Sequence, residues 1–317
     1  MAKGKHVTAP PLVSLVTVHF NQPDATLAFL ESAQRLTYPR VEILVVDNGS
    51  RTAPLDPAVV SRFPGTRLLV SAENLGFAGG NNLALREANG DFLLLVNNDT
   101  ELTPDLLENL LESFADPTVG VVCPKIRFFH HPDVIQYAGY RPLNPWTGQT
   151  TPFGKGEPDR GQYDRPGPTH FAHGAAMMLR REVLDTVGLM DETYFLYYEE
   201  LDWSHRIQRA GYVVFYQPRA LVYHKESLSV GKQSPLKVYY QTRNRLLFMR
   251  RCATPWQRAV FALYFLGAAL PKNVFGFLLR GQVALARAYL RGVGWHFKNR
   301  GSAQDYSAKP IPNLVPA

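Results

Sequence analysis

Three apolar segments of the chain end on polar side chains that could hold a ligand. The segments span residues 12–20, 41–47 and 91–97, and each reads as a buried strand. In an open α/β sheet, ligands bind beyond the carboxyl ends of the strands. One such end is ordinary turn chemistry, but three converging ends predict a pocket. The polar residues at these ends are His19, Asn21, Asp47, Asn48, Asn97, Asn98 and Asp99.

Asp99, preceded by Asn98, offers oxygen ligands that suit a hard divalent cation. Mg²⁺ or Mn²⁺ often takes one or two protein carboxylates and completes its coordination with phosphate oxygens and water. Because this end carries a single carboxylate, we expect a free metal ion to bind weakly. His224, which ends the run ALVYH, is by itself more typical of a surface or core histidine, but together with Asp99 it becomes a candidate metal ligand.

Three carboxylates, Glu199, Glu200 and Asp202, follow a run of aromatic residues in the stretch YFLYYEELDW. Acids in the first turn of a helix can simply complement the helix dipole. Crowded carboxylates beside apolar rings can also have raised pKa values, and such a group suits general base catalysis. The pattern leaves both interpretations open.

The segment ENLGFAGGNN (73–82) carries Gly76, Gly79 and Gly80 at an expected helix start. Amide groups at such a start favour anions. The segment has neither the G-x-G-x-x-G spacing of a dinucleotide site nor the GK[ST] of a P-loop. Taken alone it indicates a tight helix start, and it gains meaning only beside the three strand ends.

Alternation of apolar strands and helical patterns predicts an α/β fold with a mostly parallel sheet flanked by helices. TRLLVS (66–71) reads as a further strand, and YVVFY (212–216) and ALVYH (220–224) read as two short strands. Residues 141–170 are rich in glycine and proline and show no periodicity. Long loops of this kind often serve as lids or binding segments.

Charge is distributed unevenly along the 317 residues, whose formal net charge is +7. No Asp or Glu occurs between Glu226 and Asp305, and such segregation predicts a negatively charged partner, either nucleic acid or an anionic membrane. The basic residues in this span are Lys232, Lys237, Arg243, Arg245, Arg250, Arg251, Arg258, Lys272, Arg280, Arg287, Arg291, Lys298 and Arg300.

The predicted domains are an α/β domain over residues 1–234 and a basic helical extension over 235–317. The apolar run 260–270 is interrupted by Pro271, Lys272 and Asn273, so we expect it to fall short of the ~20 apolar residues that span a bilayer. The arginines beyond it lie among Leu, Phe and Trp, a pattern typical of an interfacial amphipathic helix. A helical cap packed on the α/β domain is the alternative.

Cellular location is indicated by two features. The two cysteines, Cys123 and Cys252, lie far apart and form no metal-type pair, which favours a reducing compartment. The N-terminal stretch MAKGKHVTAPP lacks an apolar signal core, so we expect no secretion. With the basic helices, this predicts a cytoplasmic protein that is peripheral at the inner face of the cell membrane.

An ordered set of segments resembles glycosyltransferase family 2, in its rhamnosyltransferase-like branch, over roughly residues 12–252. The segments are VSLVTVHFN, VDNGS, ENLGFAGGNN, LLLVNNDTEL, GAAMMLRREV, MDETYFLYYEELDWSHRIQRAGY, VYH and YYQTRNRLLFMRR. The resemblance implies a GT-A fold, a Rossmann-like α/β architecture, and inverting transfer from a nucleoside diphosphate sugar. It implies a dTDP- or UDP-sugar donor, with rhamnose favoured, a glycan or lipid-linked acceptor, and a role in cell wall or polysaccharide biosynthesis.

The same resemblance implies roles for individual residues. Thr17, His19 and Asn21 would line the nucleotide, Asp47 would read the pyrimidine base, and Asn98 would lie beside the donor. Asp99 and His224 would hold Mg²⁺ or Mn²⁺. Glu200 would be the base, although Asp is usual there, so Asp202 stays an alternative. Asn97 replaces the first acid of the family's Asp-X-Asp element. The segment beside the nucleotide sugar would contain Asn74, Gly76, Phe77 and Asn81.

Two further functions compete with this interpretation. A nucleotidyltransferase that makes sugar nucleotides usually has a Gly-rich loop with Lys or Arg near the first strand, and VTVHFNQPDAT has none. A nucleic-acid-binding module would use the basic helices, but it leaves the strand-end acids and YYEELDW unexplained. We therefore expect no nucleic acid partner. The sequence determines neither the sugar, the linkage nor the oligomeric state.

Overall fold

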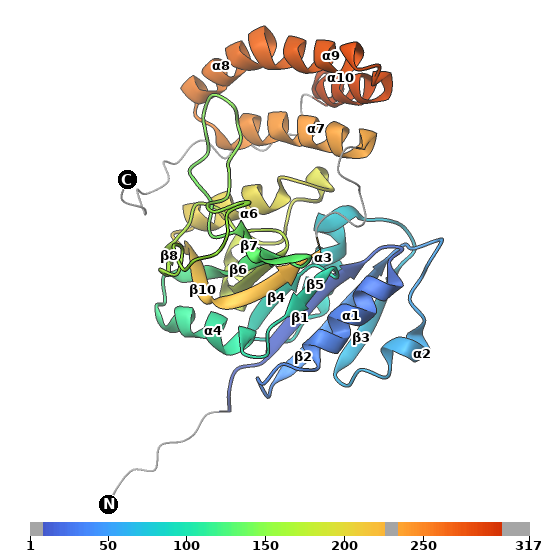
Figure 1. Cartoon of the computed structure of the whole chain (residues 1–317), viewed down its shortest axis with the longest axis vertical. Helices are drawn as coiled ribbons and strands as arrows, with labels where there is room; N and C mark the ends of the chain where they lie inside the picture. The colour runs from blue at the N-terminus through green and yellow to red at the C-terminus, as the bar shows by residue number, and fades with distance from the viewer. Residues whose placement is uncertain (1–8, 226–233, 300–317) are drawn as a thin grey trace, which may run out of the picture.

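The structure, a computed structural model, describes residues 9–225 and 234–299. Its strands form a ten-stranded sheet with helices on both faces, and further helices lie beyond one edge of this layer (Figure 1). The strands are β1 (Val13–His19), β2 (Val41–Asn48), β3 (Thr66–Ser71), β4 (Phe92–Val96), β5 (Thr100–Leu102), β6 (Val119–Phe128), β7 (His131–Tyr137), β8 (Gly167–Pro168), β9 (Ala176–Arg180) and β10 (Val213–His224).

The helices alternate with the strands as the sequence predicts and then follow one another. They are α1 (Pro23–Ala33), α2 (Pro57–Val60), α3 (Gly76–Glu87), α4 (Leu106–Glu112), α5 (Arg181–Val187), α6 (Glu199–Arg209), α7 (Pro235–Cys252), α8 (Pro255–Tyr264), α9 (Leu270–Leu279) and α10 (Val283–Lys298). Short 3₁₀ turns cover Ser113–Ala115 and Glu192–Tyr194, and a π-helical turn covers Phe265–Ala269.

The sheet is mixed, with strand order β3-β2-β1-β4-β9-β6-β10-β5. The β3-β2-β1-β4 half is parallel, and β9 runs antiparallel to both β4 and β6. The expected α/β architecture with flanking helices and a C-terminal helical extension is therefore confirmed. Because the parallel strands share one direction, the ends of β1, β2 and β4 meet at one edge of the sheet.

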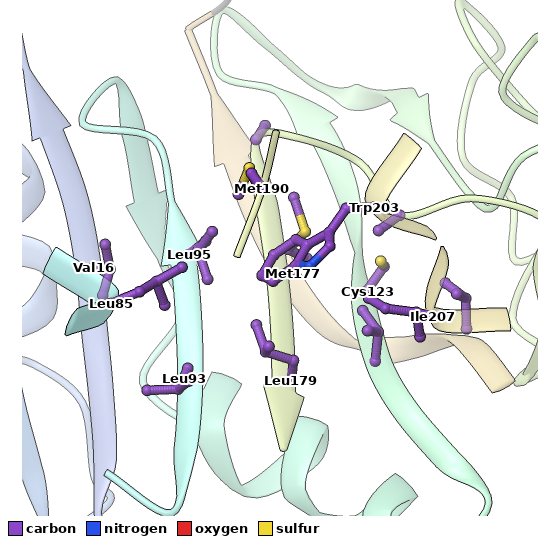
Figure 2. Packing of buried hydrophobic residues seen from close by; sticks show 14 of the residues in the cluster. Val16, Leu85, Leu93, Leu95, Cys123, Met177, Leu179, Met190, Trp203 and Ile207 are labelled. Atoms are coloured by element: carbon purple, nitrogen blue, oxygen red, sulfur yellow. The ribbon is translucent and has the colours of Figure 1, made fainter. Parts of the chain in front are cut away.

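Side chains alternate between two cores on opposite faces of the sheet, as the pleat of a strand requires. Val16 of β1 and Leu95 of β4 belong to the first core, where Leu85 of α3 and Trp203 of α6 also lie (Figure 2). Their neighbours along each strand, such as Leu15, face the second core, which is covered by α1 and α4. This alternation decides which polar residues at the strand ends can share a site.

β10 is one long strand where the sequence predicts two short ones. It pairs with β6 over its whole length, with an irregularity between Gln217 and Leu221. That irregularity contains Pro218, which cannot donate to a ladder and is accommodated at a bulge. The continuous strand carries His224 to the edge where β1, β2 and β4 end.

The four C-terminal helices pack on the α/β unit through a third core. It joins Phe171 and Tyr194 of the α/β unit to Phe248 of α7, Phe261 of α8 and Tyr289 of α10. α7 begins at Pro235, capped by Ser234, so the predicted boundary falls where this helix starts. The division into two domains stays a prediction, and residues 226–233 and 300–317 of the predicted domains lie outside the described residues.

Pro271 does not interrupt the apolar segment, and that expectation was wrong. One helical run extends over Pro255–Leu279, 25 residues that are long and apolar enough to cross a membrane by length and composition. Pro271 lies in the first turn of α9, directly after the π-helical turn. A π-turn shifts the hydrogen-bond register, which accommodates a residue without an N–H. Asn273 Nδ2 donates to the Ala269 carbonyl at 2.7 Å and satisfies a carbonyl at this point.

Several arginines of the acid-free span have structural partners inside the protein. Arg251 pairs with Asp191 at 2.5 Å, and Arg243 donates to the carbonyl of Tyr194 at 2.7 Å. These two therefore do not serve an anionic partner. Lys232 and Arg300 lie outside the described residues. The exposed cations on the helices are Lys272, Arg280, Arg287, Arg291 and Lys298.

Candidate active site

A cavity of about 580 Å³ opens at the carboxyl ends of the parallel strands. Val18 and Phe20 of the first strand end, Asn48 of the second and Asn97 after β4 lie in its wall. The converging strand ends thus build the pocket that the sequence predicts. The predicted site residues that line it are Asn74, Gly76, Phe77, Asn98, Asp99, Glu200 and His224.

Asp99 and His224 face each other in this cavity. β5 and β10 are antiparallel neighbours, and their register places His224 opposite Thr100, the residue after Asp99. Asp99 Oδ1 lies 3.1 Å from His224 Nε2, and both side chains are almost fully buried. Gln136 Oε1 lies 2.9 Å from His224 Nδ1. An amide oxygen only accepts, so this contact holds a proton on Nδ1 and directs Nε2 at the carboxylate.

This pair could hold a divalent cation. Imidazole and carboxylate are both common ligands of Mn²⁺, and an oriented Nδ1–H is the usual second contact of a metal-binding histidine. A carboxylate oxygen and an imidazole lone pair at this separation repel each other unless a proton or cation lies between them. Among residues 9–225 and 234–299, no group of three His, Cys, Asp or Glu side chains could hold a metal. Further ligands would have to come from a bound molecule.

Glu200 lies in the first turn of α6 and lines the same cavity. The turn before it is strained, since Tyr197 and Tyr198 have positive φ angles of 69° and 75°. Asn244 of α7 fixes that turn, because its Nδ2 donates to the carbonyls of Leu196 and Tyr197, each at 2.7 Å. A strained turn held by outside contacts is typical of a functional segment.

Burial raises the pKa of Glu200 to about 7, against the backbone amides of α6 that lower it. Burial and the neighbouring Glu200 also raise the pKa of Glu199 well above its ordinary value. This shift favours the protonated form of Glu199. Glu200 can ionise near neutral pH, and neither its Oε2 atom nor that of Glu199 has a hydrogen-bond partner within the described structure. A carboxylate in this state can accept a proton near pH 7.

Asp202, the alternative base, is not brought to the cavity. Its side chain is fully buried on the other side of α6, where Arg206 Nε donates to Oδ2 at 2.9 Å. The Tyr194 hydroxyl donates to Oδ1 at 3.1 Å. Two residues along a helix point in different directions, so Asp202 and Glu200 cannot both face one ligand.

The glycine-rich start of α3 is a packing device. Gly76 has a φ of +72°, and a Cβ there would lie 2.2 Å from the Phe195 carbonyl oxygen. The Phe77 amide donates to that same oxygen at 2.6 Å, and the Gly76 amide donates to Asn74 Oδ1 at 2.8 Å. These amides are therefore occupied and do not form the anion site that a helix start can offer. Asn81, buried in α3, donates to the Phe77 carbonyl and does not line the cavity.

Four residues predicted to contact the nucleotide lie outside the cavity wall. Thr17, His19 and Asp47 alternate with Val18 and Asn48 and so face the second core side of the sheet. Asp47 accepts from the amides of Ser50 and Leu55, each at 3.0 Å. His19 Nε2 lies 3.0 Å from the Ala53 carbonyl oxygen, and Asn21 Oδ1 accepts from the amides of Thr52 and Ala53. Together they shape the loop 50–55, and their contact with a nucleotide stays a prediction.

The loop 141–170, which the sequence predicts to be a lid or binding segment, supplies wall residues that no sequence pattern singled out individually. Gln149 and Lys155 come from it, while Tyr140 and His173 flank it. The rings of Tyr140 and His173 stack with centroids 5.8 Å apart. Burial lowers the pKa of His173 to about 3, so this ring is neutral. Gln136 was also missed, since nothing in the sequence marks it as the partner of His224.

Comparison with known proteins identifies the family. The sequence profile described as Glycosyl transferase family 2 matches residues 14–188, more than half of the chain. The chain belongs to glycosyltransferase family 2. An N-acetylglucosaminyl-diphospho-decaprenol L-rhamnosyltransferase of Mycobacterium tuberculosis is 26% identical over 278 residues, which cover 78% of this chain and 87% of that protein. The chain is therefore a glycosyltransferase, and it is similar to this rhamnosyltransferase along most of its length.

Solved structures show that this glycosyltransferase has the GT-A fold. A mannosyltransferase from Pyrobaculum calidifontis, in complex with GDP-Man and Mn²⁺, matches with a TM-score of 0.54 at 19% identity and covers 94% of this chain and 89% of its own. S. aureus TarS 1-349, in complex with UDP-GlcNAc, matches with a TM-score of 0.55 at 17% identity and covers 90% and 81%. Family membership also decides between the three functions left open by the sequence, in favour of glycosyl transfer.

Proposed function

We propose that this glycosyltransferase moves a sugar, with inversion, from a nucleoside diphosphate sugar to a hydroxyl of a lipid-linked glycan. One observation carries the proposal: the Asp99–His224 pair lines the same cavity as Glu200, whose Oε2 has no hydrogen-bond partner among the described residues. In the proposed reaction, the Asp99–His224 pair serves the leaving diphosphate, and Glu200 serves the attacking hydroxyl. These groups must lie on opposite sides of the sugar ring.

The proposed donor is a dTDP- or UDP-sugar with a rhamnose-like sugar. Support comes from the mycobacterial relative, whose name describes an L-rhamnosyltransferase. GDP-Man and UDP-GlcNAc in the two structural neighbours support a nucleotide sugar of some kind. Asp47, at the end of β2, keeps its proposed role in reading the base, because each of its oxygens accepts one amide and retains a second lone pair.

Mg²⁺ or Mn²⁺ is the proposed cofactor, with Asp99 and His224 as its ligands. When bound, the ion supplies positive charge that stabilises the diphosphate as it leaves. Two ligands from the protein match a cation that takes its remaining ligands from the diphosphate and water. The Mn²⁺ in the mannosyltransferase supports a divalent ion for the proposed reaction.

Glu200 is the proposed general base. Its carboxylate removes the proton of the acceptor hydroxyl while that oxygen forms a bond to the anomeric carbon. The bond between this carbon and the diphosphate breaks, and the diphosphate departs with the electron pair. A single displacement inverts the anomeric centre and needs no covalent enzyme intermediate. Lys155 and Lys237 line the cavity and place further positive charge beside it.

The proposed location is the inner face of the cell membrane. A lipid-linked acceptor stays in the bilayer, and the mycobacterial relative is named for a decaprenol-linked substrate. Phe261, Phe265 and Ala269 pack one stripe of the long helical run against the third core. The opposite stripe is exposed and apolar, and exposed cations lie near it, which favours a helix lying in the interface over one that spans it. The exposed apolar residues of this run are Trp256, Leu263, Leu266, Phe275, Leu278 and Leu279, and α10 adds Val283, Leu290 and Phe297.

A donor panel followed by a transfer assay tests the proposal. The full chain is heated with dTDP-rhamnose, UDP-GlcNAc or GDP-mannose, each with Mn²⁺ or Mg²⁺, and a bound donor raises the melting temperature. The preferred donor is then supplied with N-acetylglucosamine linked to a prenyl diphosphate. We expect a product whose anomeric configuration is opposite to that of the donor. Retained configuration, or stabilisation by no donor, would overturn the proposal.

A further inference from the structure

A second cavity, of about 230 Å³, adjoins the active-site cavity. The two share Gln149, Tyr198 and Gln241 as wall residues, so they meet at the point where the loop 141–170, α6 and α7 come together. Tyr198 lies two residues before Glu200. A molecule could therefore occupy both cavities, with one end beside the proposed base and the other among the C-terminal helices.

Arg245 brings an unbalanced positive charge to this second cavity. Its Nε donates to the Thr147 carbonyl, but its Nη2 is buried without a hydrogen-bond partner, and no ion pair involves it among the described residues. Phe261 and Phe265 lie over the guanidinium at 5.5 and 5.8 Å. Ring faces attract the charge, yet they do not replace acceptors for N–H groups, which point along the guanidinium plane.

The positive charge of Arg245 acts on two tyrosines that line the cavity, Tyr198 and Tyr289. Burial raises the pKa of Tyr198 and of Tyr289, and Arg245 opposes that rise in both. A guanidinium nitrogen that is buried without an acceptor is costly, and a bound phosphate group would supply the missing acceptor. Glu199 and Glu200 are the carboxylates nearest along the chain to Tyr198, and both line the other cavity.

The far wall of the second cavity is formed by the helical run that also carries exposed apolar residues. Phe265, Asn273 and Phe277 line it from the long helical run. Phe275 and Leu278, on either side of Phe277, are exposed on the outer face of that same helix. In Figure 1, α8 and α9 form the outer layer of the extension, with α7 between them and α6. The cavity thus lies between the active site and the surface proposed to contact the membrane.

We propose that the second cavity is the subsite for the phosphate groups of a prenyl-diphosphate-linked acceptor, with Arg245 as their ligand. The inference rests on the proposed function, since it assumes a lipid-linked acceptor, and it adds the place where that acceptor is held. The acceptor sugar extends past Tyr198 towards Glu200, and the prenyl chain leaves past Phe277 towards the apolar face. The donor diphosphate belongs to the other cavity, where Asp99 and His224 lie.

Binding of farnesyl diphosphate to the full chain tests the subsite. Calorimetry compares it with farnesol, which lacks phosphate, and with inorganic pyrophosphate, which lacks the chain. We expect Arg245→Met to weaken farnesyl diphosphate binding roughly 10-fold or more, because a charge-assisted hydrogen bond is lost. Farnesol binding should be unchanged. Arg287→Met, at an exposed arginine of α10, is the matched control and should bind like the parent protein.

A second variant leaves Arg245 and its contact with Thr147 intact. Asn273→Asp places a carboxylate in the same cavity, where it competes with phosphate for the guanidinium. It should weaken farnesyl diphosphate binding even if Arg245→Met disturbs the loop. Unchanged binding in both variants overturns the proposal.

Two outcomes would assign Arg245 another role and also overturn the proposal. If Arg245→Met weakens UDP binding with Mn²⁺ in parallel, the arginine serves the donor. If it reduces binding to phosphatidylglycerol vesicles as strongly as binding to farnesyl diphosphate, the arginine is a general membrane contact. Failure of UDP with Mn²⁺ to bind the parent protein would count against the proposed function, while the comparison of farnesyl diphosphate with farnesol would still decide the subsite.

Discussion

Asp99 Oδ1 lies 3.1 Å from His224 Nε2, although the two residues are far apart in the sequence. The short strand β5 turns back after Asp99 and pairs with the end of β10, and that register alone brings them together. Gln136 then fixes the orientation of the imidazole. The pair is built by backbone pairing and a second contact, so removing either side chain should leave the sheet intact.

Asp99→Ala should abolish the stabilisation that Mn²⁺ and UDP produce together. With a single carboxylate, the site should bind Mn²⁺ alone weakly and bind it well only when the diphosphate adds oxygen ligands. The measurement is the melting temperature with Mn²⁺, with UDP and with both. Glu101→Ala removes a nearby carboxylate that pairs instead with Lys225 at 3.6 Å, and it should keep the joint effect. A large shift with both ligands in Asp99→Ala would contradict the metal role.

Glu200→Gln should lower the rate of transfer by ~10²–10⁴ while donor binding persists, because only the proton acceptor is lost. Steady-state kinetics and donor titration separate the two effects. Glu199→Gln is the matched control, since burial and Glu200 hold the pKa of Glu199 well above its ordinary value and an amide is close to isosteric with the protonated acid. If both variants lose the same fraction of the transfer rate, Glu200 cannot be distinguished from Glu199 as the general base.

The rate should rise with pH across neutrality. Glu200 must be ionised to accept a proton, and its pKa is about 7, so kcat/KM of the free enzyme should increase from pH 5 to 8 with a midpoint near 7. A profile that is flat over this range, with chemistry limiting the rate, would exclude Glu200 as the base.

Stability should depend on pH in the opposite direction. The folded protein holds a proton on Glu200 up to about pH 7, whereas the unfolded chain releases it near the ordinary value of 4.5. The folded state therefore binds more protons between these values, and stability falls as the pH rises through them. Glu200→Gln removes this contribution, so its melting temperature should match that of the parent below pH 4.5 and exceed it at pH 8.

Gly76→Ala should destabilise the protein and lower activity together. The new Cβ would meet the Phe195 carbonyl and displace the turn that leads to Glu200. Gly281→Ala is the control, because its φ of +69° is also left-handed but nothing lies within 4 Å. The control should cost about 1 kcal/mol, and Gly76→Ala about 1–3 kcal/mol more. Denaturant unfolding measures both, and equal losses would show that the contact with Phe195 is unimportant.

Replacing Leu263 and Leu279 by Glu should release the protein from anionic vesicles. These side chains are 77% and 88% exposed, so the fold does not need them. Inserting a leucine is worth ~1.5–3 kcal/mol, which makes a loss of binding of roughly 10-fold or more the expected result in a sedimentation assay. Val70→Glu changes an equally exposed residue, at 70%, on β3 and should have no effect. Unchanged binding by the double variant would refute contact through this face.

Continuous runs of apolar residues predicted the central strands, because a strand that is buried on both faces has apolar side chains at nearly every position. Apolar runs also predicted the helical extension. The pairing of Asp99 with His224 was predicted from the resemblance to family 2. No short sequence motif contains both residues. Strand alternation would also have separated Thr17 and His19 from Val18, since neighbours along a strand face opposite sides. Asp202 was separable from Glu200 in the same way, by helical geometry.

Other features depend on tertiary contacts that a single sequence does not display. Arg243 and Arg251 belong to a basic span, yet they satisfy carbonyls and a carboxylate of the α/β unit. Pro271 breaks a simple helical pattern, and only the π-helical turn before it explains why the helix continues. The roles of Gln136 and Arg245 depend on partners far away in the sequence. Gln136 contacts His224, and Arg245 contacts Thr147.

The shared wall of the two cavities also sets an order of assembly during synthesis. The strand ends and α6 emerge from the ribosome first and can fold as the chain grows. Gln241 closes the wall between the cavities only when α7 has formed, and Tyr289 completes the second cavity from α10. A nascent chain therefore acquires the proposed metal ligands before the proposed acceptor subsite. The subsite is finished only once the helices that would meet the bilayer have themselves been made.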